Sequence, residues 1–392
     1  MKTAGVICEF DPFHKGHEYL LAEVRRQGAE AVVCAMSGNF IQRGGAALVN
    51  KAARAEMAVR CGADLVLELP TPWAMATAET FASGGVQILG MAGCSHIAFG
   101  SECGDAEKLA YVADTLLLPA LQADIRAALA TGITYAAARQ QAVQGRIGAA
   151  AEVLRQPNDT LAVEYLKACR WLGIDLTPIA VRRVGAGHDG GAEGGFASAS
   201  HIRALLRQGE WADGYLPEPA AEVLRRELAA GRMADIGNVE RTIMDRLRRM
   251  EEADFAAYDG GGEGLYHRLY GAVRRCATPE EVLAETKTKR YTAARIRRMV
   301  LSAWLGLERA PERVPYLRVL AANGTGRALL RQMRDSGAPV LTKAADVVQL
   351  GAEAEVLFRR EAMYTDCYTL AYAACGQSLP DSDWRLTPIM VK

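Results

Sequence analysis

Two histidines near the start of the chain have the types and spacing of a phosphate-handling site. His14 and His17 flank Lys15 and Gly16, and they stand where an apolar run gives way to a helical pattern. Three residues apart at a helix start, both imidazoles can face the same side of the incoming turn. The free N–H groups and the dipole of a helix N-terminus favour phosphate, and a glycine lets the backbone approach it closely. The pair therefore predicts a nucleotide triphosphate site.

The chemistry that suits such a pair is adenylyl transfer. An attacking group hits the α-phosphorus of ATP, pyrophosphate leaves, and charge grows on the equatorial and leaving oxygens. Imidazoles that donate hydrogen bonds to those oxygens meet the main catalytic requirement. The alternative is that His14 and His17 are polar residues that decorate a helix N-cap. Their place after the first predicted strand favours the catalytic role, because an open parallel sheet presents its phosphate-binding end there.

The elements that must position this site alternate between strand and helix through the first half of the chain. Short runs rich in Val, Ile and Leu predict buried strands at 3–8, 31–36, 65–69 and 96–99. Helical composition and spacing occupy 16–27, 51–61, 73–89 and 105–118. A longer helical stretch at 121–154, a strand at 174–184 and a helix at 198–208 follow. This alternation predicts right-handed βαβ units and a doubly wound parallel sheet.

Beyond about residue 210 strand signals become sparse and charged amphipathic helices dominate. These predicted helices cover 218–230, 238–250, 279–307 and 326–333. Two glycine-rich segments, 185–195 and 259–264, predict loops. The chain is therefore expected to be an α/β protein, with a doubly wound, Rossmann-like domain at 1–212 and a mainly α-helical domain at 213–392.

Composition sets broad limits on function. Hydrophobic residues make up 50% and charged residues 23% of the 392 residues, which is ordinary for a globular protein. The net charge of zero gives no indication of nucleic-acid binding. The sequence contains no run of about 18 apolar residues, so it predicts no membrane span. A cytoplasmic protein is the default expectation. The nine cysteines are scattered without a CxxC pair, so we expect packing residues, Cys8 included, and no protein metal site.

The first motif extends into a longer string that carries a family resemblance. Residues 9–17 read Glu-Phe-Asp-Pro-Phe-His-Lys-Gly-His. The string resembles the signature of the HxGH nucleotidyltransferase superfamily and, within it, the bacterial tRNA(Met) cytidine acetate ligase family. Phe10 and Asp11 stand where that family has tyrosine and asparagine. Further segments match in the family's order and span nearly the whole chain: 36–44, 51–54, 62–70, 99–102, 157–159, 182–184, 198–203, 287–292 and 315–318.

The resemblance implies a set of ATP contacts. They fall on Ile7, Cys8, Glu9, Phe10, Asp11, Pro12, Phe13, His14, Lys15, Gly16, His17, Glu18, Tyr19 and Leu20, and on Gly100, Asn158 and Arg183. Bare backbone at Gly100 can lie against adenine or ribose, the Asn158 amide both donates and accepts, and Arg183 can grip phosphate. Asn158 could instead belong to a Pro-Asn turn before a helix at 160–167, and Arg183 could be an ordinary strand-end arginine. No role is assigned to His188, because the loop before it differs from the family's.

Two further segments carry possible binding residues. Ser198, Ser200 and Arg203 resemble the serine-rich helix start that binds departing phosphates in many nucleotidyltransferases, with simple N-capping as the rival explanation. The densest basic run contributes possible tRNA contacts at Lys287, Lys289, Arg290, Tyr291, Arg295 and Arg298. Its cations could neutralise phosphates and its tyrosine could stack on a base, although a solvated helix face would look the same.

By resemblance, the chain is expected to be a two-step ATP-dependent ligase with His14 and His17 as its catalytic residues. Acetate becomes acetyl-adenylate, and the N4 amine of the wobble cytidine (position 34) of elongator tRNA(Met) then takes the acetyl group. Mg²⁺ is expected to accompany ATP. Two alternatives stay open: an adenylyltransferase acting on a small metabolite, and a non-catalytic RNA-binding protein with a retained nucleotide fold.

Overall fold

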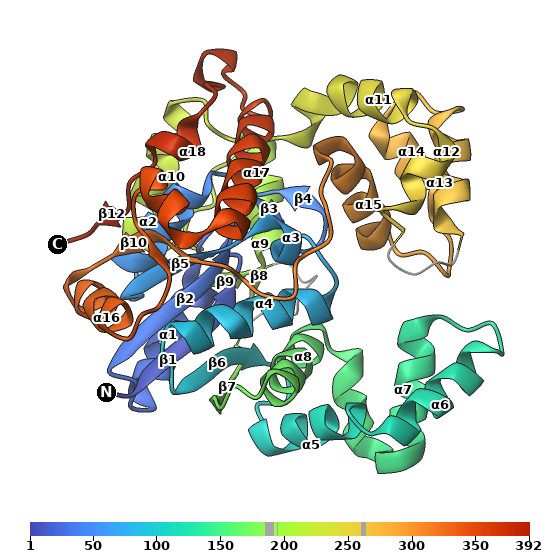
Figure 1. Cartoon of the computed structure of the whole chain (residues 1–392), viewed down its shortest axis with the longest axis horizontal. Helices are drawn as coiled ribbons and strands as arrows, with labels where there is room; N and C mark the ends of the chain where they lie inside the picture. Colours follow the sequence, from blue (N-terminus) through green and yellow to red (C-terminus); the bar gives the residue numbers. More distant parts are fainter. Residues whose placement is uncertain (185–191, 194, 260–263) are drawn as a thin grey trace.

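The chain folds around one eight-stranded sheet (Figure 1). The computed structural model describes residues 1–184, 192–193, 195–259 and 264–392, so His188 and most of the two glycine-rich segments lie outside the described residues. In the described chain the strand order is β11-β10-β5-β2-β1-β6-β7, with β12 beside β10. Their bounds are β1 Thr3–Cys8, β2 Ala31–Ser37, β5 Leu65–Leu69, β6 His96–Ser101, β7 Thr177–Arg182, β10 Leu317–Ala322, β11 Val340–Leu341 and β12 Ile389–Met390.

The five N-terminal strands confirm the predicted doubly wound parallel sheet. β1 pairs in parallel with β2 from Thr3↔Ala31 to Cys8↔Met36, and β5, β6 and β7 continue in parallel on either side. The chain starts in the middle of the sheet, moves outward to β5, and then returns to the other side of β1 at β6. The strand order therefore reverses between β1 and β6, and open α/β sheets bind their ligands at the carboxyl end of such a switch point.

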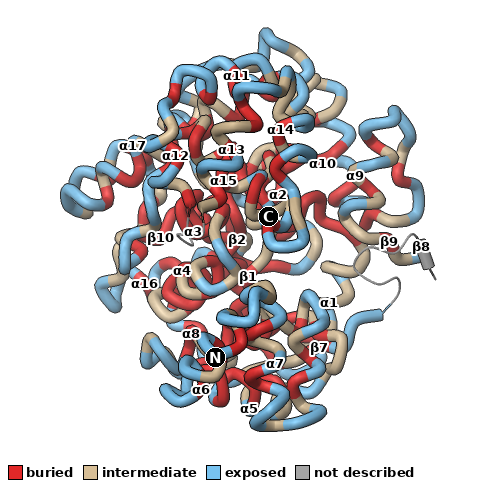
Figure 2. Tube along the Cα trace, turned by 90° about the vertical axis from the view of Figure 1, so that its right-hand side faces the viewer, coloured by how far each residue is buried: buried red, intermediate tan, exposed pale blue. Residues whose placement is uncertain are grey.

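Helices cover both faces of the sheet because successive strand residues point to opposite sides. In β2, Val33 and Ala35 join one hydrophobic core, whereas Val32 and Cys34 join the other. The first core packs against α4 (Ala78–Met91), α5 (Ala106–Leu116), α8 (Pro157–Leu172), α16 (Gly324–Asp335) and α17 (Ala352–Thr369). The second packs against α1 (Lys15–Arg26), α2 (Lys51–Arg60), α9 (Ala199–Arg207) and α10 (Glu218–Ala229). Figure 2 shows these buried segments beneath exposed helix surfaces.

Two predicted helical stretches are broken by local capping. The segment 73–89 divides into α3 (Thr71–Ala74) and α4, because the Thr77 hydroxyl caps α4 by accepting from the Thr80 N–H. The stretch 121–154 divides into α6 (Pro119–Leu129), α7 (Tyr135–Ile147) and the 3₁₀ turn η1 (Gly148–Arg155). Thr134 caps α7, and Gly132, with φ of +85°, turns the chain between α6 and α7.

Five C-terminal helices form a separate layer, which we call the helical module. It comprises α11 (Glu240–Arg249), α12 (Glu252–Ala256), α13 (Leu265–Val273), α14 (Pro279–Thr286) and α15 (Ala293–Leu305). A third hydrophobic core holds them together and reaches Phe40 in the N-terminal half. The predicted single helix at 279–307 is wrong: Thr292 caps a new helix, α15, so residues 287–292 are a connection between α14 and α15.

The C-terminal half is mainly helical, as predicted, but it also returns to the sheet. β10 pairs antiparallel with β5, and β11 and β12 flank β10 in parallel. All six residues of β10 are buried. The strand Leu317–Ala322 includes the charged Arg318 and pairs with β5, which lies far earlier in the sequence, so it escaped prediction. The boundary between residues 212 and 213 stays a prediction, and the sheet draws strands from both sides of it.

A buried ionic cluster fastens the returning segment to the first half. The Lys51 ammonium lies 2.6 Å from the Glu68 carboxylate and 2.8 Å from that of Asp383 in α18 (Ser382–Arg385). Arg318 of β10 pairs with Asp383 at 3.0 Å. Glu361 of α17 accepts hydrogen bonds from the Thr71 N–H and hydroxyl at 2.8 and 2.9 Å. Burial and then the Glu68 charge raise the pKa of Glu361 to about 8.

Replacing Glu361 with glutamine should remove the fall in unfolding free energy that this carboxyl causes between about pH 4.5 and pH 8. The pKa of Glu361 is about 8 in the folded protein against an ordinary 4.5. Its protonated carboxyl therefore adds its full contribution to the unfolding free energy below pH 4.5, and that contribution is lost as the pH rises toward 8. The unfolding free energy of the variant minus that of the wild type should therefore increase with pH across this window. Urea unfolding at pH 5, 6.5 and 8 measures the difference, and a pH-independent difference contradicts it.

No helix in the described parts of the chain combines the length and apolar character needed to cross a bilayer. The nine cysteines are free thiols, with Cys34, Cys94 and Cys169 buried and Cys375 exposed. The packing role predicted for the cysteines therefore holds best for these three buried thiols.

Candidate active site

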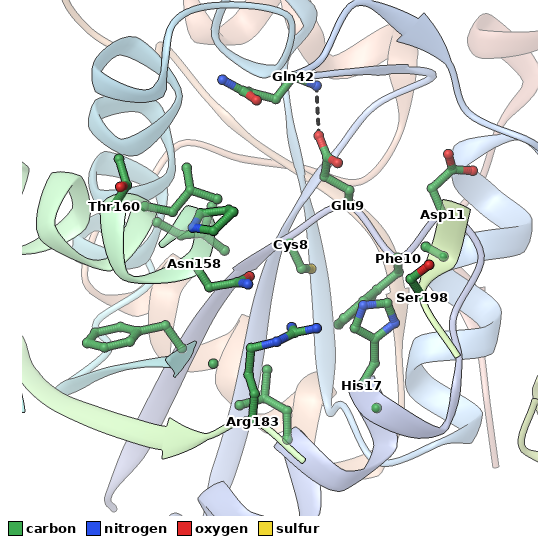
Figure 3. Close-up of a pocket in the computed structure, with 18 of the residues that line it drawn as sticks. Cys8, Glu9, Phe10, Asp11, His17, Gln42, Asn158, Thr160, Arg183 and Ser198 are labelled. Carbon is green, nitrogen blue, oxygen red and sulfur yellow. Dashed lines mark hydrogen bonds between the residues drawn. The ribbon is translucent and has the colours of Figure 1, made fainter. Parts of the chain in front are cut away.

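A cavity of about 790 Å³ opens at the carboxyl ends of β1, β6 and β7, beside the switch point (Figure 3). Ten of the fourteen motif residues predicted to contact ATP line it, whereas Pro12, Phe13, Lys15 and Glu18 do not. The other predicted residues also gather on its walls: Gly100, Asn158, Arg183, Ser198, Ser200 and Arg203. Segments nearly 200 residues apart in the sequence therefore converge on one space.

The two histidines are fixed by the first turn of α1. His14 is the N-cap, and its Nδ1 accepts a hydrogen bond from the Gly16 N–H at 3.0 Å. The His14 N–H in turn donates to Nδ1 of His17 at 3.3 Å, and the two rings stack with centroids 3.7 Å apart. Since both Nδ1 atoms accept, each neutral ring carries its proton on Nε2. The N-capping role is therefore present, and it uses only the Nδ1 atoms. Both Nε2–H groups remain able to donate hydrogen bonds to a ligand in the cavity.

Both imidazoles are neutral at pH 7 in the absence of a phosphate. Burial, followed by the positive charges of Arg183 and Arg203, lowers the pKa of His14 to about 3. Burial and the neighbouring His14 hold the pKa of His17 well below its usual range. The pair therefore offers hydrogen-bond donors without positive charge, and an anionic ligand would stabilise their protonation.

Aromatic packing holds the motif in shape. Phe10 is buried, with its ring centroid 4.9 Å from that of Phe13 and 4.8 Å from that of His17. Its backbone has a φ of +47°, a left-handed conformation that costs a non-glycine residue about 1–3 kcal/mol. The packing of both phenylalanines against His17 compensates for that cost and fixes the ring from one side.

Asn158 belongs to a clasp between β6 and α8. Its amide donates to the Glu102 carboxylate at 2.6 Å, and the Asp159 N–H donates to the same carboxylate at 2.9 Å. In return, Asp159 accepts from the Glu102 N–H at 2.9 Å. Helix α8 begins at Pro157, so Asn158 lies inside its first turn and not in a turn before it. The clasp presents Asn158 to the cavity beside Gly100.

Two arginines supply positive charge on different walls. Arg183 follows β7, and its side chain crosses Gly100, where a Cβ would lie 3.5 Å from the Arg183 Cγ. The Arg203 guanidinium donates to the Asp11 carbonyl at 2.6 Å and to the Ser200 hydroxyl at 3.1 Å. Ser198 caps α9 by accepting from the His201 N–H at 3.2 Å. The capping role proposed as the rival is therefore present, and both serines also line the cavity.

Sequence reasoning missed the groups that hold Glu9, which come from Gln42 and Arg54. The Glu9 carboxylate accepts from the Gln42 N–H at 2.7 Å, as the dashed line in Figure 3 marks. Gln42 lies in the turn between β3 (Phe40–Ile41) and β4 (Gly45–Ala46). The fully buried Arg54 donates to the Glu9 carbonyl at 2.5 Å and to the Ser37 carbonyl at 3.1 Å. Burial and then Asp11 raise the pKa of Glu9 against the opposing Gln42 N–H.

The predicted tRNA contacts divide into two groups. Lys287, Lys289 and Arg290 are exposed on the connection between α14 and α15. Tyr291 is only 8% exposed, and the guanidinium groups of Arg290 and Arg295 lie 5.9 and 5.5 Å from its ring. A base could stack on Tyr291 only by displacing those groups.

The other two cations point inward. Arg295 forms an ion pair with Asp259 at 2.8 Å. Arg298 donates to the Gln42 carbonyl at 3.1 Å, and burial lowers its pKa to about 10. Gly44, with φ of +76°, lets this turn lie against α15, since a Cβ there would be 2.5 Å from the backbone nitrogen of Arg298. The helical module thus touches the turn that holds Glu9.

Comparison with known proteins places these features in one family. Residues 1–382 match the family model described as HIGH Nucleotidyl Transferase. The tRNA(Met) cytidine acetate ligase of Acetivibrio thermocellus is 34% identical over 402 residues, 95% of each chain. That of Syntrophotalea carbinolica is 38% identical over 351 residues, 85% of this chain and 83% of the relative.

Solved structures agree over the full length. The apo crystal structure of Thermotoga maritima TmcAL superposes with a TM-score of 0.94 at 30% identity and covers all of both chains. The crystal structure of the same protein bound with alpha-thio ATP gives 0.92 at 30% identity, covering 100% of this chain and 99% of the other. With its HxGH turn at the switch point and this similarity along its length, the chain belongs to the tRNA(Met) cytidine acetate ligase family of HIGH nucleotidyl transferases.

Proposed function

We propose that this protein activates acetate with ATP and transfers the acetyl group to N4 of the wobble cytidine of elongator tRNA(Met), forming N4-acetylcytidine. The observation that carries the proposal is the pair of Nε2–H donors of His14 and His17, set in a cavity that Arg183 and Arg203 also line. Relatives named as ligases of this substrate, and a solved neighbour bound to an ATP analogue, support it.

In the first step acetate attacks the α-phosphorus and pyrophosphate leaves. Negative charge develops on the equatorial and leaving oxygens, where the imidazole donors and the N-terminus of α9 meet it. Arg183 is exposed, lines the cavity and adds a cation whose side chain has no hydrogen-bond or ion-pair partner among the described residues. Mg²⁺ is expected to arrive with ATP and to neutralise its phosphates. The described residues include no cluster of three His, Cys, Asp or Glu side chains that could hold a metal ion, so we assign it no protein ligands.

In the second step the tRNA must bring its cytidine to the same cavity. Thr292 lines the cavity and lies two residues after Arg290, the last of the exposed cations Lys287, Lys289 and Arg290. A second hollow of about 560 Å³ on the helical module is lined by the exposed cations Arg241, Arg248 and Arg249 together with Glu240 and Asp245, and Asp245 pairs with Arg249. These cations would neutralise phosphates along a path that ends at the cavity. A tRNA-modifying protein of this kind is expected in the cytoplasm.

A single incubation tests the proposal. The protein is mixed with ATP, labelled acetate and tRNA from cells that lack the modification, and label in the tRNA is measured. Labelled elongator tRNA(Met) with AMP release supports the proposal. ATP binding without label in tRNA would point to a small-metabolite adenylyltransferase if another acid or phosphate ester is adenylylated, and to a non-catalytic RNA-binding protein if none is.

Lys289→Ala should weaken tRNA use without affecting acetate activation. Losing one phosphate contact should raise the KM for tRNA several-fold and lower the slope of log affinity against log salt by about 0.7–0.9. Acetate-dependent pyrophosphate exchange without tRNA should stay at the wild-type rate. Lys343→Ala, at an exposed lysine that lines neither hollow, is the matched control. An unchanged KM and salt slope would remove Lys289 from the tRNA surface.

A further inference from the structure

Among the carboxylates on the described walls of the cavity, Glu9 is the one with an oxygen that neither a hydrogen-bond donor nor an ion-pairing cation engages. The acidic side chains on the described walls are Glu9 and Asp11. Asp11 accepts from the Leu48 N–H on Oδ1 at 2.6 Å, and its buried Oδ2, which accepts no hydrogen bond, is held in an ion pair with Arg203 at 3.3 Å. Glu9 receives the Gln42 N–H on Oε1, and its Oε2 has no hydrogen-bond donor among the described residues. Glu9 therefore retains an acceptor atom toward the cavity.

The imidazoles, the Cys8 thiol, the Tyr165 phenol and the arginines on the described walls are poorly suited to accept a proton. The Nδ1 atoms of His14 and His17 are occupied by backbone N–H groups, so their cavity-facing Nε2 atoms can only donate. Burial raises the pKa of the Cys8 thiol well above its usual range, and it raises that of the Tyr165 hydroxyl as well, so both stay protonated. Arginine side chains donate only. The second step nevertheless releases a proton that some group must take.

The position of Glu9 suits that task. Figure 3 shows it between Gln42 on one side and His17 and Arg183 on the other. The phosphate donors therefore lie to one side of the carboxylate, and the turn that contacts α15 lies to the other. Thr292, the N-cap of α15, lines the same cavity, and Arg298 of that helix contacts Gln42, so the basic connection adjoins the cavity at the helix that contacts the Gln42 turn. An amine entering from there meets the carboxylate next to the activated acyl group.

We propose that Glu9 is a further catalytic residue, the general base of acetyl transfer, and this inference rests on the proposed function. The N4 lone pair attacks the acyl carbon and forms the C–N bond, while the bond between the acyl carbon and the phosphate oxygen breaks. AMP leaves with the bonding electron pair, and Glu9 takes one of the two N4 protons. The arylamine nitrogen of cytosine is weakly basic, so removing its proton in the transition state matters more than for an alkylamine.

The groups around Glu9 fix the orientation of its carboxylate and raise its pKa. The Gln42 N–H fixes Oε1, and Arg298 holds the Gln42 carbonyl at 3.1 Å from the opposite side of the same residue. Arg54 anchors the Glu9 backbone at 2.5 Å. The charged and titratable groups that face the carboxylate are Asp11, Arg203, Arg54, Cys8 and Tyr165. Burial outweighs the cations among them, so the pKa of Glu9 is raised toward the pH at which a base must work.

Two measurements on Glu9→Gln separate this role from a role in binding ATP. Acetate-dependent pyrophosphate exchange without tRNA reports the first step, and because Glu9 is also among the predicted ATP contacts, exchange should fall by no more than about tenfold. Single-turnover transfer from preformed acetyl-adenylate to tRNA reports the second and should fall by about 10²–10⁴-fold. The wild-type transfer rate should rise with pH through an acid limb that the variant lacks. Retained exchange also shows that the variant is folded.

The outcomes are distinct. A parallel loss of exchange and transfer assigns Glu9 to nucleotide binding and overturns the inference, as does transfer at the wild-type rate. If Glu9→Gln does not fold, the wild-type profile decides: a transfer rate that is flat between pH 5 and 9 excludes a titrating base, and an acid limb above the ordinary glutamate pKa supports one. A wild-type protein that neither exchanges nor transfers acetyl groups sinks the proposed function itself.

Discussion

His17→Ala is expected to lower acetate-dependent pyrophosphate exchange by about 10²–10³-fold, the usual effect of removing one preorganised donor from a developing oxyanion. The His17 Nε2–H has its direction fixed by the hydrogen bond from the His14 N–H to Nδ1 and by the stack at 3.7 Å. Alanine removes the donor and the support it gives to the His14 ring. Initial rates of exchange at saturating ATP and acetate measure the effect.

The control for this loss is the same substitution at a histidine outside the cavity. His267 lies on α13 with its side chain 58% exposed, so His267→Ala should leave exchange unchanged. Circular dichroism and binding of an ATP analogue show whether His17→Ala keeps its fold. Exchange within tenfold of wild type, in a folded variant, would remove His17 from the catalytic site.

Lys51→Met should destabilise the protein more than the loss of any surface charge. The Lys51 side chain is 3% exposed, and its ammonium is the shared partner of Glu68 and Asp383 at 2.6 and 2.8 Å. Methionine fills a similar volume but leaves two buried carboxylates short of a positive charge. Breaking a buried pair in this way costs about 3–5 kcal/mol. The shift of the urea unfolding midpoint, with the unfolding slope checked, measures that cost.

Arg249→Ala is the matched surface control. Arg249 pairs with Asp245 one helical turn away at 2.9 Å, but its side chain is 73% exposed, so solvent screens the pair. Its removal should leave the midpoint nearly unchanged. A Lys51 variant no less stable than the Arg249 variant would mean that the cluster contributes no net stability, as replacement of buried ion pairs by apolar groups sometimes shows.

The parts of the fold that could be predicted are those encoded by neighbouring residues. β1 and β5 have the predicted bounds, because a buried parallel strand reads as a short apolar run between turn residues. The HxGH turn was recognisable because its chemistry and its place after β1 are both local. The prediction that Asn158 and Arg183 belong to the same site as His14 came from the family resemblance, and the rule that ligands bind at the switch point explains why the three share a cavity.

The parts that escaped prediction depend on partners distant in the sequence. β10 finds its partner β5 some 250 residues earlier, and nothing near Leu317 announces the pairing. Gln42 contacts Glu9 through its backbone N–H, which no residue pattern reveals, and the Arg54 guanidinium reaches the Glu9 carbonyl from 45 residues away in the sequence. Arg298 belonged to a basic run in the sequence, yet it turns inward to Gln42 because α15 packs against that turn. Charge density predicts the cations and not their direction.

The antiparallel pairing of β5 with β10 also determines how late in synthesis the sheet can be completed. A ribosome delivers β1, β2, β5, β6 and β7 well before Leu317 emerges, so the β5 edge stays open while more than half of the chain is still to come. During that interval Lys51 and Glu68 have no Asp383, and open edges invite pairing with other chains. The nascent protein therefore exposes the β5 edge for much of its synthesis. Segments made late, β10 and the one that carries Asp383, cover that edge and complete the ionic cluster.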